Sequence, residues 1–149
     1  MTNKETLIKK CAVYVEERIN RLQLAVKDLE QDLGNETKSS AGDKYETSRE
    51  MINIEINKLQ NQLQGFKKLK EILTLVENRK SSTSIQLGSM VKTNQANYFI
   101  AIPVGEITAE KEKFYGIGLN SPIGQLLLGK KVGEEFTFQQ KQYIIKEVL

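Results

Sequence analysis

The chain lacks histidine and tryptophan, and it has a single cysteine among its 149 residues. Without histidine there is no Ser-His-Asp triad, no Cys-His dyad, no zincin motif and no imidazole proton relay. The single cysteine, Cys11, permits neither an internal disulfide nor a cage of several thiolates around a metal, which suits a reducing compartment. Any chemistry carried by this chain therefore rests on carboxylates, lysines and tyrosines.

Long apolar runs are also missing. The start of the chain, Met1-Thr-Asn-Lys-Glu, leads into no run of signal-peptide or membrane-spanning length. We therefore expect a cytoplasmic protein with no membrane partner. The 22 basic and 19 acidic side chains leave a net charge of +3, which is small for a protein that mainly wraps nucleic acid. Any function of the charged residues is therefore expected to depend on where they lie in the fold and not on the net charge.

Proline is absent from the first 80 residues, whereas both prolines and most of the ten glycines lie in the rest of the chain. This change in composition predicts an α+β protein with a helical part over residues 1–80 and a sheet part over residues 81–149. A chain of this length has room for one ordinary domain or two small ones.

Two apolar seams with spacings of three and four predict two long helices in the first part. The first seam consists of Ile8, Cys11, Val15, Ile19, Leu22, Val26, Leu29 and Leu33. The second consists of Ile52, Ile56, Leu59, Leu63, Phe66, Leu69 or Lys70, Leu73 and Val76. Thr2-x-x-Glu5 is a capping box at the first helix start, and Gly34-Asn35 favours its end. The polar connection is too short to cross over, so an antiparallel coiled-coil hairpin is expected to project from the second part.

The second part has the alternating β-branched and aromatic pattern of a small antiparallel sheet. Strands are predicted at Ser89–Lys92, Tyr98–Val104, Phe114–Leu119, Phe136–Gln139 and Tyr143–Val148, with their aromatic residues in the core. Ser121-Pro122 predicts the start of one short helix, because serine is a favoured cap and proline a favoured first residue. Gly129 is expected to close this helix, which covers one face of the sheet.

Acidic residues are concentrated where the hairpin is expected to turn, near residues 34–47. The stretch from Asp28 to Glu50 contains seven acidic and three basic side chains, whereas the remainder of residues 1–80 has a net positive charge. A rod with a negative tip and a positive shaft suits insertion into a site that takes carboxylates and tolerates a phosphate backbone alongside. The alternative is that these are the mixed charges of any exposed helical surface.

Asp43 and Glu46 are the most specific candidate pair of functional carboxylates at this tip. Three residues apart on a helix, their side chains share one face and can approach one metal ion. Mg²⁺ prefers six oxygen ligands and is often bound by one or two carboxylates together with water and phosphate. The same Asp-x-x-Glu spacing is also a helix capping box, and both roles can hold in one molecule.

Together the two parts resemble the Gre transcript-cleavage factors of bacterial RNA polymerase. The resemblance is most specific at Asn120-Ser-Pro-Ile-Gly-Gln-Leu-Leu-Leu-Gly-Lys-Lys-Val-Gly-Glu, in the closing Tyr143-Ile-Ile-Lys-Glu-Val-Leu, and at the tip Gly42-Asp43-x-x-Glu46. It implies an FKBP-like second domain that docks at the rim of the polymerase secondary channel through Asn120, Ser121 and Pro122. The hairpin would enter the channel, where Asp43 and Glu46 would help the polymerase hold a shared Mg²⁺ and cut backtracked RNA.

On this interpretation the protein is not an enzyme. It is a cofactor of RNA polymerase that binds no small-molecule substrate and no cofactor of its own, with the RNA 3′ end as a second contact in the channel. Two alternatives stay open. One is a secondary-channel regulator of the same shape that does not stimulate cleavage. The other is a coiled-coil interaction or chaperone-like protein whose second domain binds peptides.

Overall fold

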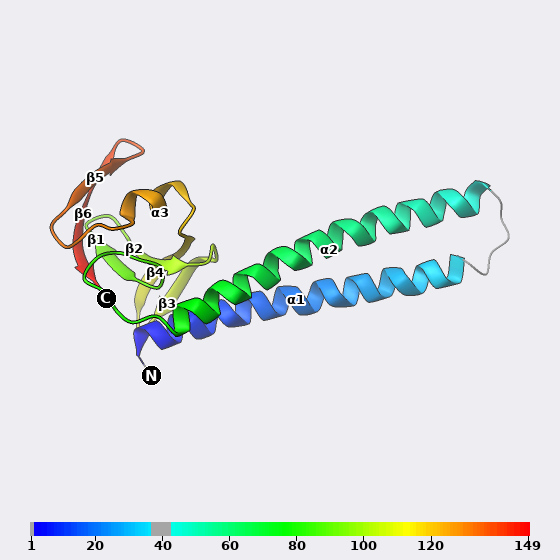
Figure 1. Cartoon of the computed structure of the whole chain (residues 1–149), viewed down its shortest axis with the longest axis horizontal. Coiled ribbons are helices and arrows are strands. Elements are labelled where there is room, and N and C mark those ends of the chain that lie inside the picture. Colours follow the sequence, from blue (N-terminus) through cyan, green and yellow to red (C-terminus); the bar gives the residue numbers. More distant parts are fainter. Residues whose placement is uncertain (1, 37–42) are drawn as a thin grey trace. The chain divides into compact units, whose positions relative to one another are not determined.

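The computed structural model describes residues 2–36 and 43–149, and it confirms the α+β class. Two long helices, α1 (Asn3–Glu36) and α2 (Asp43–Glu77), precede a six-stranded sheet with one short helix (Figure 1). The chain forms two compact units, one of residues 15–69 and one of residues 1–14 with 70–149. The helix ends are thus grouped with the sheet, and the predicted division into folding domains near residue 80 stays a prediction.

The capping box predicted at the start of α1 is confirmed. The Glu5 N–H donates to Thr2 Oγ1 at 3.1 Å, and the Thr2 N–H donates to Glu5 Oε2, also at 3.1 Å. The predicted stop at Gly34-Asn35 is one residue too early, because α1 continues to Glu36. A glycine costs a helix only about 1 kcal/mol relative to alanine, so it weakens a long helix without ending it. In the same way, α2 passes through Gly65 without a break.

In the unit of residues 15–69, the two helices bury the seam that the spacing predicts. Val15, Ile19 and Val26 of α1 and Leu63 of α2 are buried, and the other seam residues of this unit are half-buried. Apolar side chains off the seam are exposed, among them Leu24, Met51 and Ile54. At the ambiguous seam position, Leu69 is half-buried and Lys70 is exposed, so the leucine belongs to the seam.

The six strands of the sheet lie in the order β3-β4-β2-β1-β6-β5. Their bounds are Met90–Thr93 (β1), Asn97–Ala101 (β2), Gly105–Ala109 (β3), Glu112–Gly118 (β4), Glu135–Phe138 (β5) and Lys141–Val148 (β6). Five of them correspond to the predicted runs. The strand β3 was not predicted, because it is an edge strand with a single buried residue, Ala109, and therefore has hardly any apolar alternation. The predicted strand Tyr98–Val104 extends too far, since β2 ends at Ala101.

The sheet is mixed, so the prediction of an antiparallel sheet is wrong at one pair. β2 and β4 are parallel, with Tyr98 opposite Tyr115, and every other neighbouring pair is antiparallel. The chain leaves β2, runs along the sheet edge as β3, and returns as β4 between β3 and β2. An unrecognised β3 is the reason for the error, because with one strand omitted the direction of β4 is reversed.

Both faces of the sheet are buried. On one face, Val91, Ile100 and Ile145 pack with Leu127 of α3 (Pro122–Leu127), which Figure 1 shows lying across the sheet. Phe99, the neighbour of Ile100 in β2, points to the opposite face and is completely buried. Leu7 and Val76, at the sheet-associated ends of α1 and α2, are also completely buried.

None of the helices described over residues 2–36 and 43–149 has the length and apolar character needed to cross a membrane.

Candidate functional site

The loop that holds Asn120, Ser121 and Pro122 is built around the Ser121 side chain. Ser121 is the cap of α3, with extended backbone angles (φ −66°, ψ 155°), and its Oγ accepts a hydrogen bond from the Gly124 N–H at 3.1 Å. The Oγ also donates to the Gly118 carbonyl at 2.7 Å. The predicted capping role of Ser121 and the place of Pro122 in the first turn are both confirmed.

Close packing fixes this loop further. A Cβ on Gly124 would lie 2.5 Å from the Gly118 carbonyl oxygen and 2.9 Å from that of Leu119, so only glycine fits. The Gln125 side-chain amide donates to the Leu119 carbonyl at 2.8 Å. The turn before α3 is therefore held by both backbone and side-chain contacts.

Asn120 and Pro122 are the exposed residues of this turn, whereas Ser121 is half-buried. Behind them, Ile123 and Leu127 of α3 pack on the sheet core. The loop thus presents an amide side chain and a proline ring on a surface that α3 supports. Ser121 acts through its hydrogen bonds to the loop.

The predicted carboxylate pair, Asp43 and Glu46, lies at the start of α2, in the compact unit of residues 15–69. α2 begins at Asp43, and Glu46 in its first turn is exposed. The Asp43 side chain lies outside the described residues, as does the predicted capping interaction that depends on it. The structure groups Asn120–Pro122 with the sheet and residues 43 and 46 with the helical unit, so the two predicted sites belong to different units.

Among the described side chains, no three acidic, histidine or cysteine residues lie close enough together to hold a metal ion. A carboxylate pair such as Asp43 and Glu46 would supply oxygen ligands of the kind that Mg²⁺ prefers, but fewer than the six it needs.

Cys11 is completely buried, and burial raises the pKa of its thiol to about 12. Cys11 is thus a core residue, as its place in the seam predicts, and little of its thiol is in the reactive thiolate form. The aromatic residues of the sheet are mostly core as predicted, with Phe99, Phe114, Tyr98 and Tyr143 buried. Burial, and to a lesser extent a hydrogen bond with Tyr143, raises the pKa of Tyr98, which makes its phenol unsuited to proton transfer near neutral pH.

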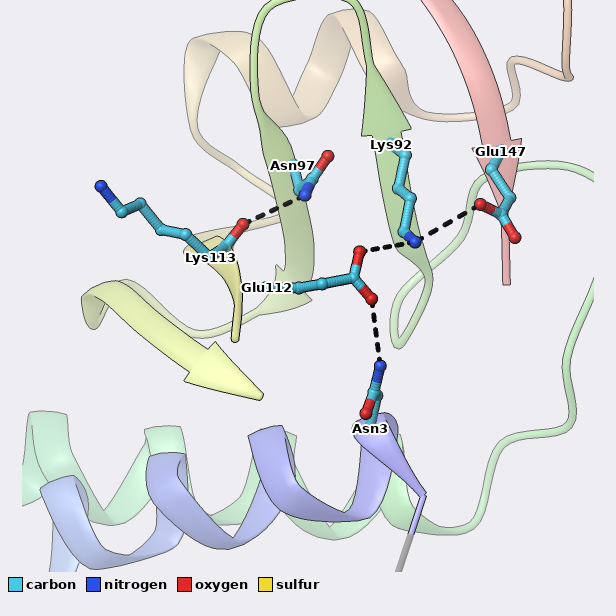
Figure 2. A network of polar contacts seen from close by, with 6 residues as sticks. All are labelled: Asn3, Lys92, Asn97, Glu112, Lys113 and Glu147. Carbon is cyan, nitrogen blue, oxygen red and sulfur yellow. Dashed lines mark hydrogen bonds and ion pairs between the residues drawn. The ribbon is translucent and has the colours of Figure 1, made fainter. Parts of the chain in front are cut away.

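A polar network at the start of α1, shown in Figure 2, was not predicted from the sequence. Lys92 of β1 lies 2.6 Å from Glu112 of β4 and 3.5 Å from Glu147 of β6, measured from Nζ to the nearer carboxylate oxygen. Glu112 also accepts a hydrogen bond from the Asn3 side-chain amide at 3.3 Å. The four residues are far apart in sequence and come from three strands and from α1, so no local pattern could have revealed them.

The chain matches none of the known protein-family models, and a search of the curated proteins finds no match.

Proposed function

We propose that the protein is a Gre-like transcription elongation factor, which binds RNA polymerase at its secondary channel and stimulates the enzyme's own cleavage of backtracked RNA. The observation that carries this proposal is the Asn120–Pro122 loop. Asn120 and Pro122 are exposed on a turn that Ser121 and Gly124 hold in place, as a docking surface requires. The same three residues carry the sequence resemblance to the docking loop of the Gre factors.

The architecture supports the proposal in outline. A small sheet unit follows two helices of 34 and 35 residues, each about 50 Å long at 1.5 Å per residue. We interpret these helices as an antiparallel coiled-coil hairpin and the sheet with α3 as an FKBP-like domain. In the proposed complex the hairpin tip enters the channel in the cytoplasm, close to the RNA 3′ end.

Asp43 and Glu46 are the residues proposed to act at the polymerase active site. As neighbours on one helix face they would present two carboxylates to a Mg²⁺ shared with the polymerase. A bound divalent ion polarises phosphate oxygens and lowers the pKa of bound water. The protein's own part is to place two negative charges at the end of a rod, and it has no hydrolytic activity alone.

The decisive experiment is transcript cleavage by a stalled, backtracked RNA polymerase from the same organism. Asp43→Ala/Glu46→Ala is expected to abolish the stimulation while the protein still co-purifies with the polymerase. Glu17→Ala/Glu55→Ala is the matched control, because it removes the same number of negative charges from exposed positions on the two helices outside the acidic stretch. Stimulation by the control should equal that of the wild type.

Other outcomes separate the alternatives. Binding without stimulation by the wild type would replace the proposal with a secondary-channel regulator. Absence of binding would refute both polymerase-based functions and favour a coiled-coil interaction or chaperone-like protein with a peptide-binding sheet domain.

A further inference from the structure

We propose that the side-chain amine of Lys4 is an acylation site, which a small acyl phosphate modifies without the help of another enzyme. The site lies wholly within one compact unit, because residues 1–14 and 70–149 are grouped together. The inference goes beyond the proposed function and does not depend on it, since it can be measured on the protein alone.

The Lys4 ammonium lies beside the backbone of Gly88, in apolar surroundings. A Cβ built on Gly88 would lie 3.6 Å from Lys4 Nζ and 3.6 Å from Val76 Cγ1. Gly88 and Val76 are both buried, and Lys4 itself is half-buried. Among the described residues, no carboxylate lies within ion-pair distance of this ammonium. The fold therefore places a cation beside apolar atoms without a counter-charge.

The position of Lys4 in α1 also disfavours a positive charge. Thr2 and Glu5 form the capping box, so Lys4 is the second residue of the first helical turn. The N–H groups at a helix start carry partial positive charge, and a cation placed there is unfavourable. The neighbouring Glu5 carboxylate accepts a hydrogen bond from the Thr2 N–H, and adjacent residues on a helix do not face each other. Glu5 therefore does not serve as the partner of Lys4.

A pocket of about 500 Å³ gives a small reagent access to the amine. Lys4 lines this pocket together with Ser81, Met90, Glu110 and Leu149. Glu110 is the other charged side chain along the described wall, and it is exposed to solvent and forms no ion pair with Lys4. The amine is thus half-buried on one side and open to a small molecule on the other.

These surroundings favour the neutral, reactive form of the amine. Burial lowers the pKa of Lys4, so at pH 8 a larger share of it is unprotonated than of an ordinary lysine. Only the unprotonated nitrogen has the lone pair that attacks an acyl carbon.

The reaction is a simple acyl transfer. Lys4 Nζ forms a bond to the acyl carbon, the bond between that carbon and the phosphate oxygen breaks, and inorganic phosphate leaves with the electron pair. The nitrogen releases one proton to water. The product is a neutral amide, which no longer places a charge beside apolar atoms and the helix start.

The first test is competitive acetylation of the folded protein by a limiting amount of acetyl phosphate at pH 8, with each lysine followed by peptide mass spectrometry. Lys9 is the control, because it lies on the same helix and is exposed. Lys4 is expected to be acetylated several-fold faster than Lys9, and the two rates should become equal in urea. A Lys4 rate no higher than that of Lys9 in the folded protein would overturn the proposal, as would an excess that persists in urea.

The second test supplies the missing counter-charge. Ser81→Asp puts a carboxylate on the pocket wall, whereas Ser81→Asn adds a neutral group of the same shape. Ser81 is exposed and lies outside the helices and strands, so both variants should fold. The reagent here is acetic anhydride, a neutral donor, so that repulsion of a phosphate does not contribute. Ser81→Asp should slow the acetylation of Lys4 several-fold and Ser81→Asn should not, whereas equal rates in the two variants would overturn the proposal.

The third test measures what loss of the charge does to the fold. Lys4→Gln imitates the neutral product and is expected to raise the unfolding temperature by about 1–3 °C at pH 7, because it removes an unfavourable charge. Lys9→Gln should leave the unfolding temperature unchanged. An unchanged or lower unfolding temperature for Lys4→Gln would overturn the inference that a charge is unfavourable at this position.

Discussion

Lys92 of β1 forms an ion pair with Glu112 of β4, with 2.6 Å between Nζ and Oε2, although β2 lies between their strands. The same ammonium lies 3.5 Å from Glu147 on the neighbouring strand β6. The hydrogen bond to Glu112 is the main cause that raises the pKa of Lys92, while partial burial opposes it. One lysine therefore ties together three strands and, through Glu112, the start of α1.

Replacing Lys92 with methionine is expected to lower the free energy of unfolding by about 1 kcal/mol at pH 7, at the upper end for exposed ion pairs. Because the folded-state pKa is raised, this stabilisation is complete below the unfolded lysine value of about 10.4 and disappears as pH rises through the folded value. Urea unfolding should show a smaller difference in the free energy of unfolding between wild type and Lys92→Met at pH 11 than at pH 7. Lys113→Met, which breaks an exposed pair, serves as the control, and a gap that stays constant with pH would contradict this assignment.

Gly124 and Gly65 should respond oppositely to alanine. At Gly124 the added Cβ would meet carbonyl oxygens at 2.5 and 2.9 Å, so we expect a loss of about 1–3 kcal/mol of stability. At Gly65, in the middle of α2, nothing lies within 4 Å of the added atom, and alanine should stabilise the helix by about 0.5–1 kcal/mol. Chemical denaturation of the two variants measures both effects, and a stable Gly124→Ala would show that the loop before α3 is adaptable.

The apolar seam predicts different effects for two neighbouring leucines. Leu22 lies on the seam and is half-buried, whereas the Leu24 side chain is 63% exposed. Leu22→Asp should destabilise the helical unit by about 2–3 kcal/mol, since it places a charge in an apolar contact. Leu24→Asp should change stability by no more than about 0.5 kcal/mol. Thermal unfolding followed by helix circular dichroism compares the pair, and equal effects would mean that the seam is misplaced.

Cys11 is expected to resist alkylation in the folded protein. Its thiol is completely buried and has a pKa of about 12, so hardly any reactive thiolate forms at pH 8. Iodoacetamide should label the native chain far more slowly than the chain in urea, where the thiol returns to its ordinary pKa of about 8.5. Similar rates in the two states would place Cys11 at the surface.

Local signals in the sequence predicted most of the secondary structure. The capping box at Thr2 and Glu5, the cap at Ser121 and the seams of α1 and α2 depend on residues within one or two helical turns of one another. Such short-range patterns can be recognised without knowing the fold. The strand β3 was missed for the corresponding reason: an edge strand with one buried residue has no alternation to detect.

The candidate sites divide in the same way. The Asn120–Pro122 loop could be singled out in advance, because its cap, its proline and its glycine lie within a few residues. The polar network of Asn3, Lys92, Glu112 and Glu147 could not be predicted. Its members come from α1, β1, β4 and β6, and they meet only in the folded protein.

The sequence by itself determined the elements of this protein: two long amphipathic helices, a short capped helix and a series of alternating strands, each set by interactions between near neighbours. Only the tertiary structure decided that β4 inserts parallel to β2, and that Glu112 consequently lies within reach of Lys92 and Asn3. The physical reason is that strand order depends on hydrogen bonds and burial shared between distant segments, which no single segment encodes.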